Sequence, residues 1–122
     1  MLTGQTVLIV EEEFLIALDI QRVLEDRNVG QCVCARSVAE ALSLRERWPD
    51  YQLAIVEFRA DQPDSIELLR GLTAAGIRLI ITTADHALHA GLADAPGAPI
   101  LVKPFPEADL VSAITLALTQ SA

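Results

Sequence analysis

The sequence has few cysteines, few aromatic residues, a single lysine and no long hydrophobic run. Aromatic residues make up 4% of the 122 residues. No apolar run approaches the ~18 residues that a membrane-spanning helix needs. The N-terminus carries no basic region followed by a small-residue cleavage site, so no secretory signal is visible. We therefore expect a cytoplasmic protein that makes no membrane contact.

The two cysteines, Cys32 and Cys34, lie two residues apart in a segment that favours a β-strand. This spacing places both thiols on one face of a strand, too close along it for an ordinary disulfide. We expect both to be small packing residues beside the core, without a redox role.

The chain is strongly acidic, with nine basic residues against seventeen acidic ones and a net charge of −8. A surface that binds nucleic acid needs a basic stripe, which this sequence does not contain. The acidic balance favours cations and basic partner surfaces instead. Nucleic-acid binding by this chain is therefore not expected.

Five short apolar segments, rich in β-branched residues, alternate with segments of helical period. Continuous apolar runs of this length are typical of strands that are buried on both faces of a parallel sheet. The predicted strands cover residues 7–10, 32–35, 53–56, 79–81 and 100–102.

Helices are indicated between these strands by apolar residues spaced three and four apart. The pattern is clearest over residues 16–24 and 110–118. Capping boxes at Ser37 and Asp64 predict the starts of the second and third helices, and Gly76 is expected to follow the third. The fourth helix is expected somewhere within residues 85–93.

Five strand–helix units in series predict an α/β fold. The expected architecture is a doubly wound, five-stranded parallel sheet of order 2-1-3-4-5, covered by five helices. At 122 residues, residues 1–122 are expected to form a single domain. Binding sites in such sheets form at the carboxyl ends of the strands, so the residues that follow each strand are the candidates.

Charged and hydroxyl side chains follow four of the predicted strands. They are Glu11 and Glu12 after the first, Glu57 after the third, Thr83 after the fourth and Lys103 after the fifth. Lys103 is the only lysine, and its place directly after a buried strand favours a site role over a solvated one. Two unit charges ~4 Å apart interact by about 4 kcal/mol at an effective dielectric near 20, so one lysine leaves two carboxylates repelling each other. Such a cluster takes up protons or binds a divalent cation, and oxygen ligands suit Mg²⁺ or Ca²⁺.

These motifs make the chain resemble the receiver domains of two-component response regulators, which have a flavodoxin-like fold. The family shows an acidic pair after the first strand, a phosphorylated aspartate after the third, Thr or Ser after the fourth, and Lys-Pro after the fifth. The resemblance covers about residues 6–118. It implies a Mg²⁺ site formed by Glu12, Glu57, the backbone carbonyl of Arg59 and, through water, Glu11.

The resemblance also implies a phosphoryl-binding pocket and a switch. Thr83 and Lys103 would contact the phosphoryl group, and Thr83 and Ile100 occupy the switch positions. The Lys103–Pro104 bond resembles one that the family holds in the cis form.

Several residues depart from the family pattern. Glu57 stands at the phospho-acceptor position in place of aspartate, Ile100 replaces an aromatic residue, and Asp61 replaces a proline. A glutamate carboxylate reaches roughly 1.5 Å farther than that of an aspartate. A misplacement of ~1 Å can cost about 10²-fold in the rate of phosphoryl transfer. We expect Glu57 to be phosphorylated very slowly or never, with Mg²⁺ binding weakened or lost.

The resulting hypothesis is a stand-alone receiver domain in phosphorelay signalling that is not an enzyme and acts through protein contacts. The partner would be a kinase, a phosphotransfer protein or a downstream effector, bound on the surface of the fourth helix, fifth strand and fifth helix. A homodimer through that surface is a further expectation.

Two states of the crevice are compatible with the sequence. Glu57 could mimic a phosphorylated aspartate in part, because it carries one negative charge against about −1.5 to −2 for a phosphate. It could instead pair with Lys103 and leave an inert crevice. We favour the mimic slightly.

Two other functional classes remain as alternatives. One is a structural interaction module with a degenerate crevice. The other is a small flavodoxin-like protein that binds a cofactor, which would need Gly, Ser or Thr donors after the first strand. Glu11, Glu12 and Glu13 supply the opposite charge there, which argues against a phosphate cradle.

Overall fold

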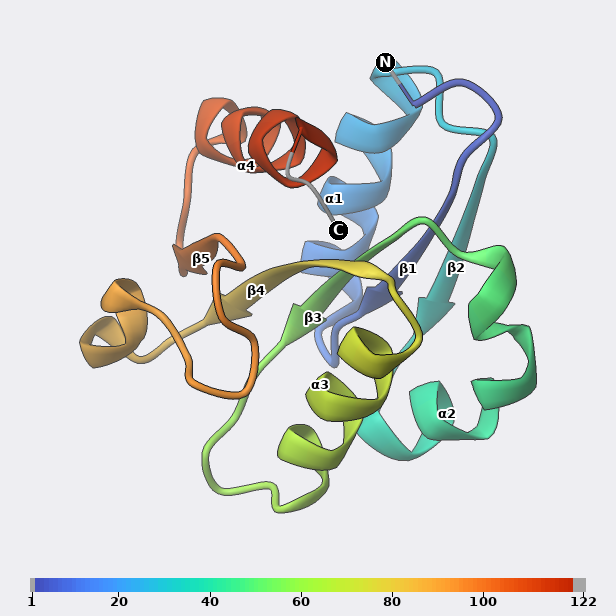
Figure 1. Cartoon of the computed structure of the whole chain (residues 1–122). Coiled ribbons are helices and arrows are strands. Elements are labelled where there is room, and N and C mark those ends of the chain that lie inside the picture. Colours follow the sequence, from blue (N-terminus) through green and yellow to red (C-terminus); the bar gives the residue numbers. More distant parts are fainter. Residues whose placement is uncertain (1, 120–122) are drawn as a thin grey trace.

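A computed structural model of the chain, described here for residues 2–119, contains one parallel sheet of five strands (Figure 1). The strand order is β2-β1-β3-β4-β5, so the predicted order is confirmed. The strands are β1 (Thr6–Val10), β2 (Gln31–Ala35), β3 (Leu53–Glu57), β4 (Arg78–Thr83) and β5 (Ile100–Val102). No helix in the described part of the chain is long and apolar enough to cross a membrane.

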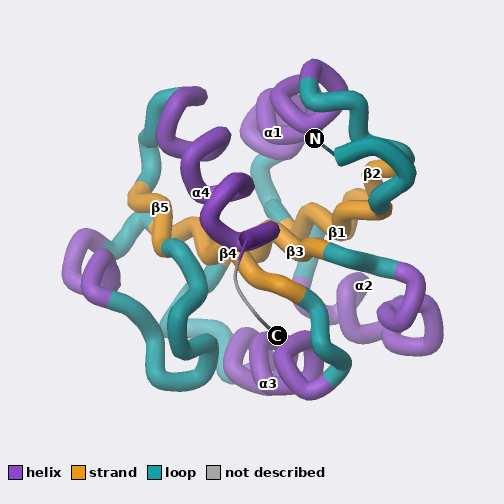
Figure 2. The backbone as a smooth tube through the Cα atoms, turned by 45° about the horizontal axis from the view of Figure 1, so that its top comes forward, coloured by secondary structure: helices purple, strands orange, loops and turns teal. Residues whose placement is uncertain are grey.

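The helical segments cover both faces of the sheet. Figure 2 shows α1 and α4 on one face and α2 and α3 on the other. The α-helices are α1 (Phe14–Asp26), α2 (Val38–Ser43), α3 (Asp64–Ala74) and α4 (Glu107–Thr119), and two 3-10 helices are η1 (Arg45–Asp50) and η2 (His86–Ala90). The predicted fourth helix lies within residues 85–93 as expected, but it is η2, a five-residue 3-10 helix that is the fifth helical segment in chain order.

Each strand contributes alternate side chains to two separate cores, because successive side chains of a strand point to opposite faces. Val7, Ile9 and Ile55 pack against α1 and α4. Leu8 and Val56 pack on the other face, against α2 and α3. Both faces are buried, which explains why the strands appear in the sequence as continuous apolar runs.

The core beneath α2 and α3 is organised around the single tryptophan. Trp48 is 2% exposed and its Nε1–H donates a 3.2 Å hydrogen bond to the carbonyl of Ala41. Gly71 of α3 lies against the indole, since a Cβ at this position would come within 2.8 Å of the ring. A glycine at this point lets α3 approach the tryptophan closely.

The two expected capping boxes have different outcomes. Ser37 caps α2, because its hydroxyl accepts a 3.0 Å hydrogen bond from the backbone N–H of Glu40. The capping box at Asp64 is wrong: Asp64 is the first residue of α3, and the preceding Pro63 makes no side-chain cap. Pro63 already has helical dihedral angles (φ −60°, ψ −31°), whereas an N-cap residue needs an extended backbone. Gly76 follows α3 with φ +80°, as expected.

The two cysteines of β2 are free thiols in different surroundings. Cys32 is half-buried and packs against the core under α1, and burial raises the pKa of its thiol to about 11. Cys34 is exposed, with its sulfur 3.7 Å from the side-chain oxygen of Gln21. The expected packing role is therefore confirmed for Cys32 and wrong for Cys34, because β2 is an edge strand and its outer positions are open to solvent.

Candidate functional site

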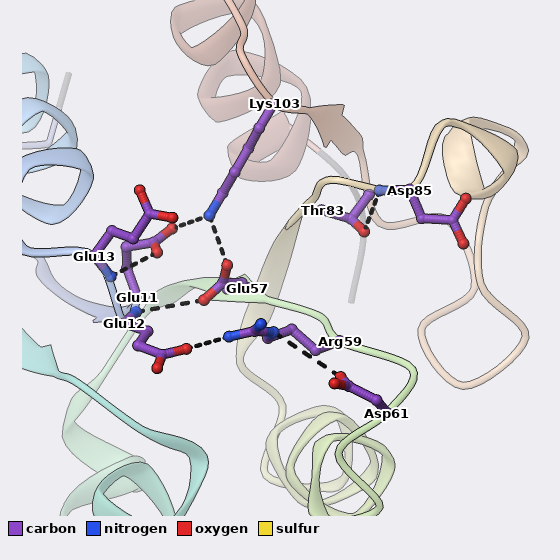
Figure 3. A network of polar contacts seen from close by, with 9 residues as sticks. All are labelled: Glu11, Glu12, Glu13, Glu57, Arg59, Asp61, Thr83, Asp85 and Lys103. Atoms are coloured by element: carbon purple, nitrogen blue, oxygen red, sulfur yellow. Dashed lines mark hydrogen bonds and ion pairs between the residues drawn. The ribbon is translucent and has the colours of Figure 1, made fainter.

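A crevice of charged side chains lies at the carboxyl end of the sheet (Figure 3). Lys103, which follows β5, places its Nζ 2.6 Å from Oε1 of Glu11 and 2.7 Å from Oε2 of Glu57. Glu11 follows β1, and Glu57 is the last residue of β3. The parallel sheet thus brings together three residues that are distant in sequence, as the rule for strand ends predicts.

The three side chains are largely removed from solvent. The exposed fraction is 1% for the Glu11 side chain, 14% for Glu57 and 12% for Lys103. Backbone groups hold the carboxylates in place: Glu13 N–H donates to Oε2 of Glu11 at 3.0 Å, and Glu12 N–H lies 3.4 Å from Oε1 of Glu57. Buried charges of this kind persist because each has a charged partner and hydrogen bonds.

The pKa values of the three groups follow from burial and from the shared lysine. Burial raises the pKa of Glu11, although Lys103 and the N–H of Glu13 both donate to it. Burial acts on Glu57 in the same direction, but the hydrogen bond and charge of Lys103 outweigh it and hold the pKa of Glu57 below its ordinary value. Burial disfavours the ammonium of Lys103, yet its hydrogen bonds to Glu11 and Glu57 raise its pKa overall. The cluster therefore carries a persistent ammonium between two acidic groups.

Thr83 lies at the same end of the sheet but is engaged elsewhere. Its side chain is buried, and its Oγ1 accepts a 3.1 Å hydrogen bond from the backbone N–H of Asp85. In Figure 3 this hydroxyl lies apart from Glu57. Glu57, Thr83 and Lys103 nevertheless line one hollow of about 250 Å³. The structure therefore brings the predicted residues to one site, where Lys103 and the N–H of Glu12 donate to Glu57 and the Thr83 hydroxyl is engaged with Asp85.

Arg59 joins the crevice through its side chain, which the sequence analysis did not anticipate. Its guanidinium forms an ion pair with Oε2 of Glu12, and its Nε lies 3.9 Å from Oδ1 of Asp61. Only the backbone carbonyl of Arg59 was expected to take part. The sequence did show a basic residue two positions after Glu57, close to the acidic strand ends. Its partner Glu12 is 47 residues away, however, and the sequence pattern does not identify a pair at that separation.

The arrangement of these groups does not fit the expected Mg²⁺ site of Glu11, Glu12, Glu57 and Arg59. Among the side chains that the structure describes, which exclude those of residues 89 and 90, no group of three or more His, Cys, Asp or Glu is arranged to hold a metal ion. The carboxylates that would ligate Mg²⁺ are paired with Lys103 or with the guanidinium of Arg59. The structure shows these side chains in ion pairs, and the expected Mg²⁺ ligand set stays a prediction.

Ile100, which the resemblance places at a switch position, is the first residue of β5. It is partly buried and packs against the core beneath α2 and α3. An aliphatic side chain in this place has no ring to swing between the core and the surface. The Lys103–Pro104 peptide bond that follows β5 is cis, as expected.

The chain is similar to solved structures of response-regulator receivers, although no family model and no curated protein matches it. A receiver protein from Sinorhizobium medicae superposes with a TM-score of 0.80 at 21% identity, covering 99% of this chain and 100% of that one. A response regulator from Thermotoga maritima gives 0.78 at 20% identity, covering 95% and 98%. A chain of the CheX-CheY-BeF3-Mg²⁺ complex from Borrelia burgdorferi gives 0.74 at 15% identity, covering 97% and 92%.

The superpositions, with TM-scores of 0.74 to 0.80, establish the fold, and the strand order agrees with it. Five parallel strands in the order 2-1-3-4-5, with helical segments on both faces, give this chain the fold of response-regulator receiver domains.

Proposed function

We propose that this chain is a receiver-type signalling module whose state is set by its own side chains and not by phosphorylation. The observation that carries the proposal is the position of Lys103, which lies 2.7 Å from Glu57 and 2.6 Å from Glu11. The family resemblance assigns this lysine to the phosphoryl group. In this chain Glu57, at the acceptor position, already forms an ion pair with that lysine.

Engagement of the lysine makes Glu57 a poor phosphoryl acceptor. One carboxylate oxygen of Glu57 is bound to Lys103, and the other faces the N–H of Glu12. In-line transfer requires an acceptor oxygen that is free and correctly placed. The Glu57 carboxylate is paired with Lys103 and extends farther than an aspartate would, so its oxygens are neither free nor correctly placed.

The contacts of Glu57 reproduce only part of those expected around a phosphoryl group. Lys103 is engaged, whereas the hydroxyl of Thr83 accepts from the N–H of Asp85. Glu57 also supplies less charge and fewer acceptor atoms than a phosphate. We infer a single constitutive state that the Glu57–Lys103 ion pair fixes. In this state Glu57 reproduces only one contact of a phosphoryl group, the one with Lys103.

A module of this kind acts by binding proteins, and we propose no catalytic step for it. The similar Borrelia burgdorferi structure is a complex with CheX, which is a precedent for protein recognition by this fold. Our proposal assigns the partner to the same classes as before: a kinase, a phosphotransfer protein or a downstream effector. The exposed apolar side chains available for contact are Phe14, Leu15 and Leu18 on α1, and Leu116 on α4.

A second candidate is an interaction module in which the crevice has no regulatory role. The observation that favours it is again Thr83, whose hydroxyl is turned toward Asp85 and away from Glu57. In this case changes at Glu57 would leave partner binding unaltered.

The proposed absence of phosphorylation is tested by intact-mass analysis after incubation with Mg²⁺ and phosphoramidate. The natural chain and a Glu57→Asp variant are compared under the same conditions. We expect no phosphoryl group on the natural chain and slow gain of one by the variant. Gain of a group that maps to Glu57 in the natural chain would refute the proposal, and gain by neither protein would favour the second candidate.

A further inference from the structure

The crevice contains a second cation, the guanidinium of Arg59, which lies beside two carboxylates. Its guanidinium is paired with Glu12, which follows β1, and with Asp61 in the loop after β3 (Figure 3). The side chain of Arg59 is 42% exposed, so it reaches this position from the rim of the crevice.

The two buried carboxyl groups of the crevice, Glu11 and Glu57, already have partners within the protein. Glu11 uses Oε1 for Lys103 and Oε2 for the N–H of Glu13. Glu57 uses Oε2 for Lys103 and directs Oε1 toward the N–H of Glu12 at 3.4 Å. Three of these four oxygens face a hydrogen-bond donor, Oε1 of Glu11 has only its 2.6 Å ion pair with Lys103, and Glu12 gives one oxygen to Arg59.

Magnesium requires a different arrangement. It needs oxygen ligands at 2.0–2.1 Å in near-ideal octahedral geometry, and it loses its water reluctantly. To enter here, it would have to separate Glu12 from the guanidinium and turn at least one buried carboxylate away from Lys103. A doubly charged ion would also lie beside two fixed positive charges, which repel it.

We propose that Arg59 is a resident cation that takes the place of a divalent metal in this crevice. Together with Lys103 it neutralises two of the four carboxylates Glu11, Glu12, Glu57 and Asp61. It also links the loop after β1 to the loop after β3 without any ion from solution. The state of the crevice is consequently independent of Mg²⁺, which extends the proposed function and rests on it.

Arg59 can be tested separately because its side chain is partly exposed and lies outside both cores. An Arg59→Gln substitution removes the charge and keeps a polar side chain, while Arg59→Lys retains the charge. Arg70→Gln is the matched control, since Arg70 is an exposed arginine in a 2.7 Å ion pair with Asp94, outside the crevice. Circular dichroism establishes that each variant is folded.

The probe is Mn²⁺, a paramagnetic ion with ligand preferences like those of Mg²⁺, and the measurement is its binding by electron paramagnetic resonance with Mg²⁺ as competitor. We expect the natural chain, Arg59→Lys and Arg70→Gln to bind it weakly. Arg59→Gln should bind one ion at least tenfold more tightly, in competition with Mg²⁺, and its Tm should rise on adding the ion.

Two results would overturn the proposal. One is tight, stoichiometric Mn²⁺ binding by the natural chain. The other is weak binding by Arg59→Gln, equal to that of the natural chain, because the arginine would then not be what excludes the metal. Neither result depends on phosphoryl transfer, so failure here is distinguishable from failure of the proposed function.

Discussion

Replacing Lys103 with methionine should destabilise the protein more than any surface charge change, because it leaves two carboxyl groups at the sheet end without their cation. Lys103 lies 2.6 Å from Glu11 and 2.7 Å from Glu57. At an effective dielectric near 20, each contact corresponds to a gross attraction of about 6 kcal/mol. Desolvation of the charged groups offsets much of this attraction.

The net effect is estimated from buried ion pairs that lose one partner, which typically costs about 3–5 kcal/mol. One of the two carboxyl groups can take up a proton in the variant, so we expect a loss at the lower end, about 3 kcal/mol at pH 7. The same reasoning predicts a smaller loss near pH 4, where the two carboxyl groups of the variant, no longer beside a cation, take up protons and stop repelling each other.

Urea unfolding followed by tryptophan fluorescence measures this loss directly. Trp48 is the only tryptophan and is 2% exposed in the folded chain, so its emission reports on the core. Arg22→Met is the control, because Arg22 is 68% exposed and its ion pair with Asp19 is long, at 3.8 Å. We expect this control to lie within about 0.5 kcal/mol of the natural chain.

A double variant separates charge from packing. Adding Glu57→Gln to Lys103→Met removes one of the two unpaired charges and should recover about 1–2 kcal/mol of the lost stability. A Lys103→Met protein within about 0.5 kcal/mol of the natural chain would refute the reasoning, and so would a double variant whose losses simply add.

Two further predictions concern stability. The pKa of Lys103 is raised, so its contribution is fully present below the unfolded-state pKa of about 10.4 and is lost as the pH rises through the folded-state value. The difference in unfolding free energy between the natural chain and Lys103→Met should therefore shrink above that pH. Burial also raises the pKa of Tyr51, but this residue is present in both proteins and its effect cancels in the difference. A difference that stays constant with pH would contradict the assignment. Ser37→Ala should cost about 1 kcal/mol through loss of the cap of α2. Ser112→Ala on the exposed side of α4 should cost little in the same urea assay, and equal losses would argue against the cap.

The sheet could be predicted from the sequence because its strands are buried on both faces. Val7 and Leu8 point to opposite cores, so both must be apolar, and the resulting runs stand out against the amphipathic helices. The site followed from topology, since carboxyl ends of parallel strands meet at one edge. Glu11, Glu57 and Lys103 are brought together there, as expected.

What the sequence did not predict depends on local geometry and on long-range contacts. The pairing of Arg59 with Glu12 depends on two loops whose paths no periodicity encodes. The direction of the Thr83 hydroxyl is set by the turn at Asp85, which caps the 3-10 helix η2. The failure of Asp64 as a cap has a similar origin, because Pro63 starts the helical turn one residue earlier.

The central claim is that the crevice holds one state, independent of phosphate and metal. The most direct test is the ¹⁵N–¹H spectrum of the natural chain before and after addition of Mg²⁺ with beryllofluoride, beside a Glu57→Asp variant. The account predicts that the amides of Glu12, Phe58 and Thr83 keep their chemical shifts in the natural chain. Shifts of these amides in the natural chain, saturating with beryllofluoride, would show a working phosphoryl pocket and contradict the account.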